Sequence, residues 1–283
     1  MPGSFKETTP VFKMKGNMIL VNAIAETIKT SYQSVYVKGE TPLSLLLLAD
    51  TDHGKSGLIL NFVPEAEHLQ VERLSDVSAM GLYRAVKDKS DPVVLVIPDF
   101  HAVISHKASV TEGTLNALMT LLQDGAMKIS VGPGEPVELK GKRASLLTAM
   151  TPGMLVGRAG RWRKLGFLRR LLPIHYTYSE ATAMRIHKSI KSGEYHVPPK
   201  HFKLPVTQPQ IVRIPKPIDS EIESLAIAVS VQLENRGFTA HKFFRVFAQA
   251  RALLRKHNIV DRKDFSDLME FSKFCNLDTP QQI

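Results

Sequence analysis

The strongest constraint on the fold is a run of four leucines, Leu45–Leu48, that leads directly into the sequence ADTDHGKS. An unbroken aliphatic run of this kind is typical of a strand that is buried on both faces of a parallel sheet. The polar loop ends with Lys55 and Ser56, and a second apolar run follows. A buried strand, a polar loop and then a helix are the elements from which a parallel α/β sheet is built.

The loop matches the phosphate-binding pattern G-x-x-x-x-G-K-[ST] except at its first position, where Ala49 stands in place of glycine. In that pattern backbone N–H groups cradle phosphate oxygens, the lysine contacts them, and the hydroxyl reaches magnesium. Alanine tolerates fewer backbone conformations than glycine, so an ordinary turn that reads GKS stays open as an alternative. The residues predicted to bind a nucleotide are Asp52, His53, Gly54, Lys55, Ser56 and Gly57.

Strand and helix patterns alternate along most of the chain. A short helix is predicted over 57–66, and Thr111 is a candidate N-cap for a helix that ends at Gly125. Residues 127–142 alternate around Gly132-Pro133-Gly134, which predicts a β-hairpin. Further buried strands are predicted within 91–100, 143–152 and 171–179. The predicted fold class is therefore α/β with a parallel sheet.

Two of these strands end in polar residues that suit phosphate chemistry. Asp99 follows an aliphatic run, where a carboxylate would hold magnesium together with Ser56; the alternative is that Asp99 caps the next segment. Thr148 and Thr151 lie at or near the end of the next strand, and Thr151 is nearer to its tip. A hydroxyl there would orient an attacking water molecule.

The last third of the chain has a different pattern. Six prolines and no helical period between 195 and 217 predict an extended linker or wrapping arm. Three helical patterns follow it, which predicts a small all-helical domain over 218–283. The predicted organisation is a helical lead-in over 1–38, a nucleotide-binding core over 39–194, the linker, and this helical domain.

The composition favours a soluble protein with anionic partners. The net charge is +10, and six basic residues with no acid lie between Arg158 and Arg170. Such a run is also typical of a solvated face, so it indicates nucleic acid only weakly. The apolar stretches are too short to cross a bilayer, and the lone Cys275 has no cysteine partner. We expect a cytoplasmic location and no membrane partner.

The order of these motifs resembles the AAA+ ATPase superfamily over residues 39–180 and 219–270. DTDHGKS looks like its Walker A motif and VLVIPDF like its Walker B motif. Residues 114–152 are similar to the helix, hairpin and sensor-1 strand of minichromosome maintenance helicases and enhancer-binding activators. The segment 239–258 resembles the sensor-2 helix of the AAA+ lid, with the sequence TAHKFFRVFAQARALLRKHN.

The resemblance implies ATP and Mg²⁺ as cofactors and a homo-oligomer that shares its ATP sites. It implies an arginine finger at Arg170 or Arg169, and a phosphate contact by His241 or Lys242. The chain departs from the family pattern at Ala49, and at Phe100, where the family usually has a glutamate that polarises water. If the register shifts by one, Asp99 takes the glutamate's place and Pro98 that of the magnesium aspartate.

The function expected from the sequence is ATP binding or hydrolysis by an oligomer that acts on DNA, in replication or in the maintenance of a phage or mobile element. One alternative is a protein-remodelling or regulatory factor that does not contact DNA. Another is a scaffold that keeps the fold with weak or no catalysis, because of Ala49 and Phe100.

Overall fold

The computed structural model describes residues 22–66, 68–130, 136–192, 200–230 and 237–283. Its centre is a six-stranded sheet in the order β10-β8-β1-β7-β4-β3, in which all neighbouring strands are parallel. The predicted α/β class with a parallel sheet is confirmed. These strands are β1 (Leu45–Leu48), β3 (Gln70–Arg73), β4 (Val93–Ile97), β7 (Ala144–Met150), β8 (Leu172–Thr177) and β10 (Gln281–Gln282).

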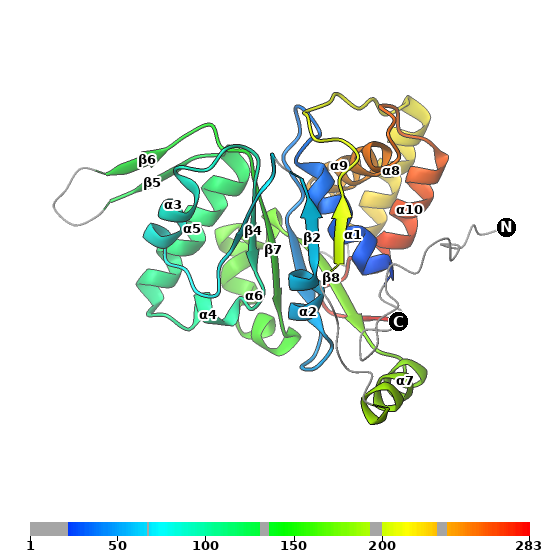
Figure 1. Cartoon of the computed structure of the whole chain (residues 1–283), viewed down its shortest axis with the longest axis horizontal. Coiled ribbons are helices and arrows are strands. Elements are labelled where there is room, and N and C mark those ends of the chain that lie inside the picture. Colours follow the sequence, from blue (N-terminus) through cyan, green and yellow to red (C-terminus); the bar gives the residue numbers. More distant parts are fainter. Residues whose placement is uncertain (1–21, 67, 131–135, 193–199, 231–236) are drawn as a thin grey trace.

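Helices cover both faces of the sheet, and the described residues contain ten α-helices and one short 3₁₀ helix. In Figure 1, α3, α4, α5 and α6 lie on one side of the sheet, and α1, α8, α9 and α10 lie on the other. The helices are α1 (Asn22–Ser34), α2 (Lys55–Asn61), α3 (Ala79–Val86), α4 (His101–Ile104), α5 (Ala108–Asp124), α6 (Pro152–Leu165), η1 (Leu168–Arg170), α7 (Glu180–Lys191), α8 (Lys216–Ser230), α9 (Phe238–Leu254) and α10 (Arg262–Ser272).

The leucine run explains why the sheet needs two helical layers. Leu45 and Leu47 belong to the core shared with α1, α8, α9 and α10, whereas Leu46 and Leu48 belong to the core shared with α3, α5 and α6. Successive side chains of a strand point to opposite faces, so an uninterrupted apolar strand requires a cover on both sides. The three C-terminal helices therefore share a core with the sheet.

Several local expectations are corrected. The helix predicted over 57–66 ends at Asn61, and the next four residues form the strand β2 (Phe62–Glu65). Thr111 is not an N-cap, because α5 begins at Ala108; its hydroxyl donates to the carbonyls of Val103 and His106. α6 follows β7 directly and was not predicted, because its glycines and arginines give it weak amphipathic periodicity.

Two small two-stranded sheets lie outside the central sheet, one an antiparallel hairpin and the other a parallel pair. β5 (Met127–Ile129) pairs antiparallel with β6 (Val137–Leu139), which confirms the predicted hairpin strands; the Gly132-Pro133-Gly134 turn lies outside the described residues. β9 (Lys200–Lys203) pairs with β2, and Val37 bridges to Gln210. The described part of the proline-rich segment is thus extended and wraps against the core.

The end of α5 shows a strict glycine requirement. Gly125 has a φ of 62° and is the C-cap residue of α5, where the sequence predicts that the helix ends. A Cβ atom at this position would lie 2.0 Å from the carbonyl oxygen of Lys142. Only glycine fits both the left-handed backbone and this close approach. No helix in the described parts of the chain is both long enough and apolar enough to cross a membrane.

Candidate functional site

The strand order creates a crevice at the carboxyl ends of β1 and β7. From β1 the chain passes to the edge strand β3 and returns through β4 to β7, and from β7 it passes to β8 on the other side of β1. Ligands of open α/β sheets bind where the direction of the connections reverses in this way. A cleft of about 540 Å³ lies there, lined by Thr51, Asp52, Gly54, Lys55, Ser56, Gly57, Asn61, Pro98, Asp99, His101, Ala149, Met150, Thr151 and Met154. We call it the carboxyl-end cleft.

The loop that enters the cleft has a strained backbone. Asp52 has a φ of 63° and Gly54 a φ of 71°, both in the left-handed region. A non-glycine residue in this region costs about 1–2 kcal/mol, and such strain clusters at ligand sites. Ala49, by contrast, is buried at the end of β1 and does not have a positive φ. The missing glycine therefore imposes no backbone strain here.

Side chains at the end of β8 and directly after it contact this loop on the side away from the cleft. The hydroxyl groups of Tyr176 and Tyr178 both donate to the carbonyl oxygen of His53, each at 2.9 Å. The His53 ring stacks on Tyr178 with centroids 4.6 Å apart, Nδ1 donates to the carbonyl oxygen of Thr51 at 3.0 Å, and Nε2 lies 3.3 Å from Thr177 Oγ1. His53 therefore anchors the loop to β8, and its side chain does not line the carboxyl-end cleft.

Lys55 is held within its own loop. Its Nζ donates to the carbonyl oxygen of Asp50 at 2.6 Å. Burial lowers the pKa of Lys55 below its ordinary value, and the carboxylates of Asp50, Asp99 and Asp52 oppose that shift. The ammonium group is thus a partly desolvated cation whose charge is compensated by three nearby carboxylates.

Ser56 and Asp99 both line the carboxyl-end cleft. Ser56 Oγ donates to the carbonyl oxygen of Pro98 at 3.1 Å, and Asp99 Oδ1 accepts from the backbone N–H of His101 at 2.9 Å. A hydroxyl and a carboxylate are oxygen donors of the kind that Mg²⁺ prefers, with water and phosphate oxygens completing its shell. These two residues therefore fit a magnesium ion in the cleft.

The two threonines of β7 have different surroundings. Thr148 is buried, and its hydroxyl donates to the carbonyl oxygen of Ile97 at 2.8 Å. Thr151 follows β7, precedes α6 and lines the carboxyl-end cleft, and its side chain makes no helix-capping hydrogen bond. Of the two threonines, only Thr151 is placed to contact a ligand in this cleft.

Phe100 faces away from the cleft. It is fully buried and packs on Phe167, with ring centroids 5.5 Å apart, and on Trp162 at 5.8 Å. This position is therefore a core position, and no carboxylate can replace Phe100 without disrupting the aromatic cluster. Trp162 is likewise a packing residue and is not available to stack on a base.

The two arginines and the two α9 residues that the sequence assigns to the nucleotide site do not line the carboxyl-end cleft. Arg169 and Arg170 precede β8 at the amino end of the sheet, where they line a second cleft together with Lys242 of α9. His241 Nε2 lies 3.7 Å from Asp219 Oδ1, which also pairs with Arg245. The structure thus does not bring His241 and Lys242 to the carboxyl-end cleft, because α9 packs against α1 and the sheet face rather than above the loop.

One further group of possible metal ligands serves the fold. His257, Asp261 and Asp264 lie close together, but Arg255 pairs with both carboxylates. Asp261 and Asp264 form a capping box at the start of α10. Burial raises the pKa of Asp264 to about 6. We interpret this cluster as a helix cap and ion-pair network.

Sequence reasoning missed several residues of the site. His101 and Asn61 line the carboxyl-end cleft, and Tyr176 and Tyr178 hold its loop. The alternation in LPIHYTYS is a signal that both tyrosines share one face of a strand, although nothing in it shows that this face meets the loop.

The sequence matches no protein-family model and no curated protein.

Proposed function

We propose that this protein binds ATP with Mg²⁺ in the carboxyl-end cleft and belongs to the AAA+ type of P-loop NTPase. The observation that carries the proposal is that one cleft, at the reversal point of the strand order, brings together Lys55, Ser56, Asp99 and Thr151. Lys55 and Ser56 begin α2, whereas Asp99 and Thr151 follow β4 and β7. Their roles would be those of phosphate contact, magnesium ligands and water orientation.

The chemistry proposed for each side chain follows from its place. Lys55 would exchange its bond to the Asp50 carbonyl for phosphate oxygens. Ser56 and Asp99 would hold the magnesium ion, which neutralises charge that develops on the phosphate groups. Thr151 would orient the attacking water molecule. The clamp of Tyr176 and Tyr178 on the His53 carbonyl fixes the loop before a ligand arrives.

We further propose that the protein works as an oligomer with shared ATP sites and acts on DNA. Arg170 donates to the Gly166 carbonyl oxygen and to Gln123, whereas Arg169 is exposed. Arg169 is therefore the freer of the two to reach a neighbouring subunit. α7 presents Arg185, Lys188 and Lys191 on an exposed face, which suits phosphate contacts with DNA. DNA affinity should then fall as salt concentration rises.

Phe100 favours a second candidate function, a nucleotide-binding switch or scaffold with little hydrolysis. Its burial leaves the carboxyl-end cleft without an acid next to Asp99. A protein of this kind would bind ATP and change partners without turnover. A regulatory factor that contacts only protein partners would show no dependence on DNA.

The proposal is tested by titrating ATP and Mg²⁺ into the protein by calorimetry. Lys55→Ala should weaken binding by about 100-fold, since it removes a charge-assisted contact to phosphate in a desolvated site. Lys164→Ala is the matched control, because Lys164 is an exposed lysine on α6 that does not line the cleft. Equal affinity of the Lys55→Ala variant and the wild type would refute ATP binding at this loop.

A further inference from the structure

A second cleft lies at the opposite end of the sheet. It is lined by Arg169 and Arg170 before β8, by Thr41 and Ser44 before β1, by Gln123 of α5, and by Thr239 and Lys242 in the first turns of α9. Its volume is about 380 Å³, which falls in the range of small-ligand sites. We call it the amino-end cleft.

The charge in the amino-end cleft is strongly positive. Arg169, Arg170 and Lys242 line it, against a single carboxylate, that of Glu40. Among the described residues, Arg169 and Lys242 have no ion pair with an acid, and the two terminal nitrogens of Arg170 donate to a carbonyl and an amide oxygen. The Nε atom of Arg170 is buried and has no hydrogen-bond partner within the described chain.

Three cations that line one cleft with a single carboxylate are only partly neutralised. Like charges at close range are unfavourable even near the surface, and an anion placed between them relieves this cost. Burial lowers the pKa of Arg170, the carboxylate of Asp124 opposes that shift, and the neighbouring Arg169 lowers the pKa further. The hydroxyl of Thr239 and the amide of Gln123 add neutral hydrogen-bonding groups to the same walls.

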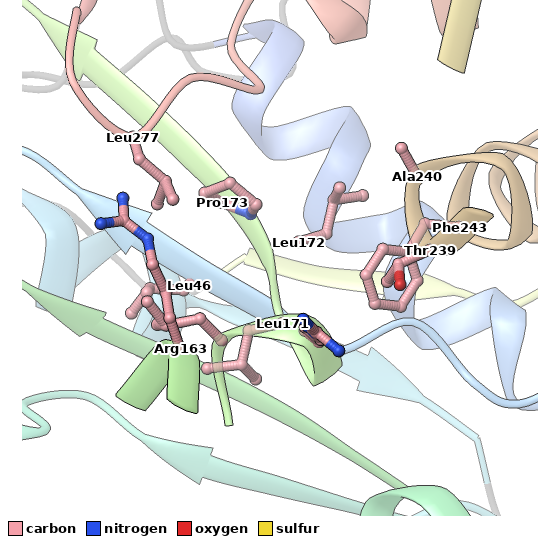
Figure 2. Close-up of a pocket in the computed structure, with 11 residues that line it drawn as sticks. Leu46, Arg163, Leu171, Leu172, Pro173, Thr239, Ala240, Phe243 and Leu277 are labelled. Atoms are coloured by element: carbon pink, nitrogen blue, oxygen red, sulfur yellow. The ribbon is translucent and has the colours of Figure 1, made fainter. Parts of the chain in front are cut away.

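A small slot with mixed polar and apolar walls adjoins the amino-end cleft. The two spaces share Arg169, Thr239 and Phe243, and the slot extends over Leu172 and Pro173 to Leu277. Figure 2 shows Phe243 and Thr239 of α9 facing Leu172 of β8. The volume of the slot is about 60 Å³, which is enough for a few atoms of an organic group. A ligand that carries both an anionic head and a small apolar part would complement both spaces.

We propose that the amino-end cleft binds a small ligand through a phosphate or pyrophosphate group, with Arg169 and Lys242 as the principal contacts. Guanidinium and ammonium groups with hydroxyl neighbours are suited to phosphate oxygens. The cleft is complete within one chain, so this binding needs neither the Lys55 loop nor a second subunit. The inference therefore does not rest on ATP binding in the carboxyl-end cleft.

The test uses pyrophosphate as the probe and the full chain carrying Lys55→Ala, so that the carboxyl-end cleft is disabled. Calorimetry is run without magnesium and at protein concentrations where sedimentation shows monomer. We expect binding at pyrophosphate concentrations up to about 1 mM. Adding Arg169→Ala or Lys242→Ala should each weaken it about fivefold, and the two together should abolish it.

Matched controls decide the outcome. Arg169 and Lys242 are both exposed, so their removal should leave folding intact, which circular dichroism checks. Lys164→Ala changes the net charge by the same amount and should not alter pyrophosphate binding. Equal weakening by Lys164→Ala, or no binding by the Lys55→Ala protein, would overturn the proposal.

Two further results would also overturn it. If a single-stranded oligonucleotide binds through Arg169 and Lys242 while pyrophosphate does not, the cleft is part of a nucleic-acid surface. If pyrophosphate binds only when the chains assemble, the arginines belong to a site shared between subunits.

Discussion

The two ends of the sheet carry clefts with opposite charge balance. At the carboxyl ends, Lys55 faces Asp52 and Asp99, so carboxylates outnumber the cation among the lining residues. At the amino ends, Arg169, Arg170 and Lys242 line the cleft with one carboxylate, that of Glu40. An anion alone meets repulsion at the first cleft and attraction at the second. If the proposed functions hold, we therefore expect the carboxyl-end cleft to need a divalent cation before it accepts a polyphosphate, and the amino-end cleft not to need one.

The backbone differs between the two ends as well. The carboxyl-end cleft is entered by a strained loop that is clamped by β8, with left-handed residues at Asp52 and Gly54. The amino-end cleft is formed mainly by side chains on η1, α5 and α9. Strain that the surrounding structure maintains is typical of a preorganised ligand site. Changes to the loop should therefore affect one cleft and leave the other unaltered.

The largest expected effect concerns the arginines. If the protein turns over ATP with shared sites, Arg169→Ala or Arg170→Ala should lower turnover by about 10³-fold while ATP affinity is kept. Specific activity of the wild type should rise with protein concentration. Steady-state phosphate release measures both.

A mixing experiment tests the same point more directly. The Lys55→Ala variant and the arginine variant, each inactive alone, should regain activity when mixed, because an intact loop can pair with an intact arginine of another subunit. A mixture that stays inactive, although mixed assemblies are shown to form, would mean that these arginines serve only their own chain.

Removal of magnesium should have the next largest effect, and it should weaken binding at the carboxyl-end cleft alone. With a chelator present, ATP affinity at the carboxyl-end cleft should fall at least tenfold, since Asp52 and Asp99 then repel the phosphates. Asp99→Asn should reduce turnover more than binding, and should make binding less dependent on magnesium. Pyrophosphate binding at the amino-end cleft should be the same with and without the metal, and calorimetry measures each case.

The loop clamp should have a smaller effect. Replacing Tyr176 and Tyr178 by Phe removes both hydrogen bonds to the His53 carbonyl and keeps the rings. Each bond contributes about 1 kcal/mol, so ATP affinity should fall several-fold as the loop loses order. His53→Ala should have a similar effect. An unchanged ATP affinity in the double variant, with the amino-end cleft as internal control, would show that the loop does not need the clamp.

The smallest expected effect is a pH dependence. Burial lowers the pKa of Lys55 below its ordinary value of 10.5, so its charge is lost earlier than that of an exposed lysine as the pH rises. Phosphate binding requires the charged form of Lys55. As the pH rises, ATP affinity should therefore begin to decrease below pH 10.5. Arginine keeps its charge over this range, so the Arg169 contact should persist. ATP and pyrophosphate titrations between about pH 8 and 10 compare the clefts.

The sequence by itself determined the elements that local chemistry controls. The leucine run had to be a strand covered on both faces, and the helix before Gly125 had to end there, because a left-handed C-cap favours glycine. The loop, Asp99 and Thr151 were placed correctly at strand ends. Carboxyl ends of parallel strands meet at one edge, so their convergence on one cleft followed from the pattern.

Only the tertiary structure decided which side chains face one another across distant elements. The ring of Phe100 turns into the core because Trp162 and Phe167 are there to cover it, and α6 forms despite a weak pattern because its buried residues complete that cluster. The clamp by Tyr176 and Tyr178 depends on β8 lying beside β1. The packing of α9 on α1 carries Lys242 to the arginines and away from Lys55. Such contacts join residues far apart in the chain, and helical or strand periodicity contains no information about them.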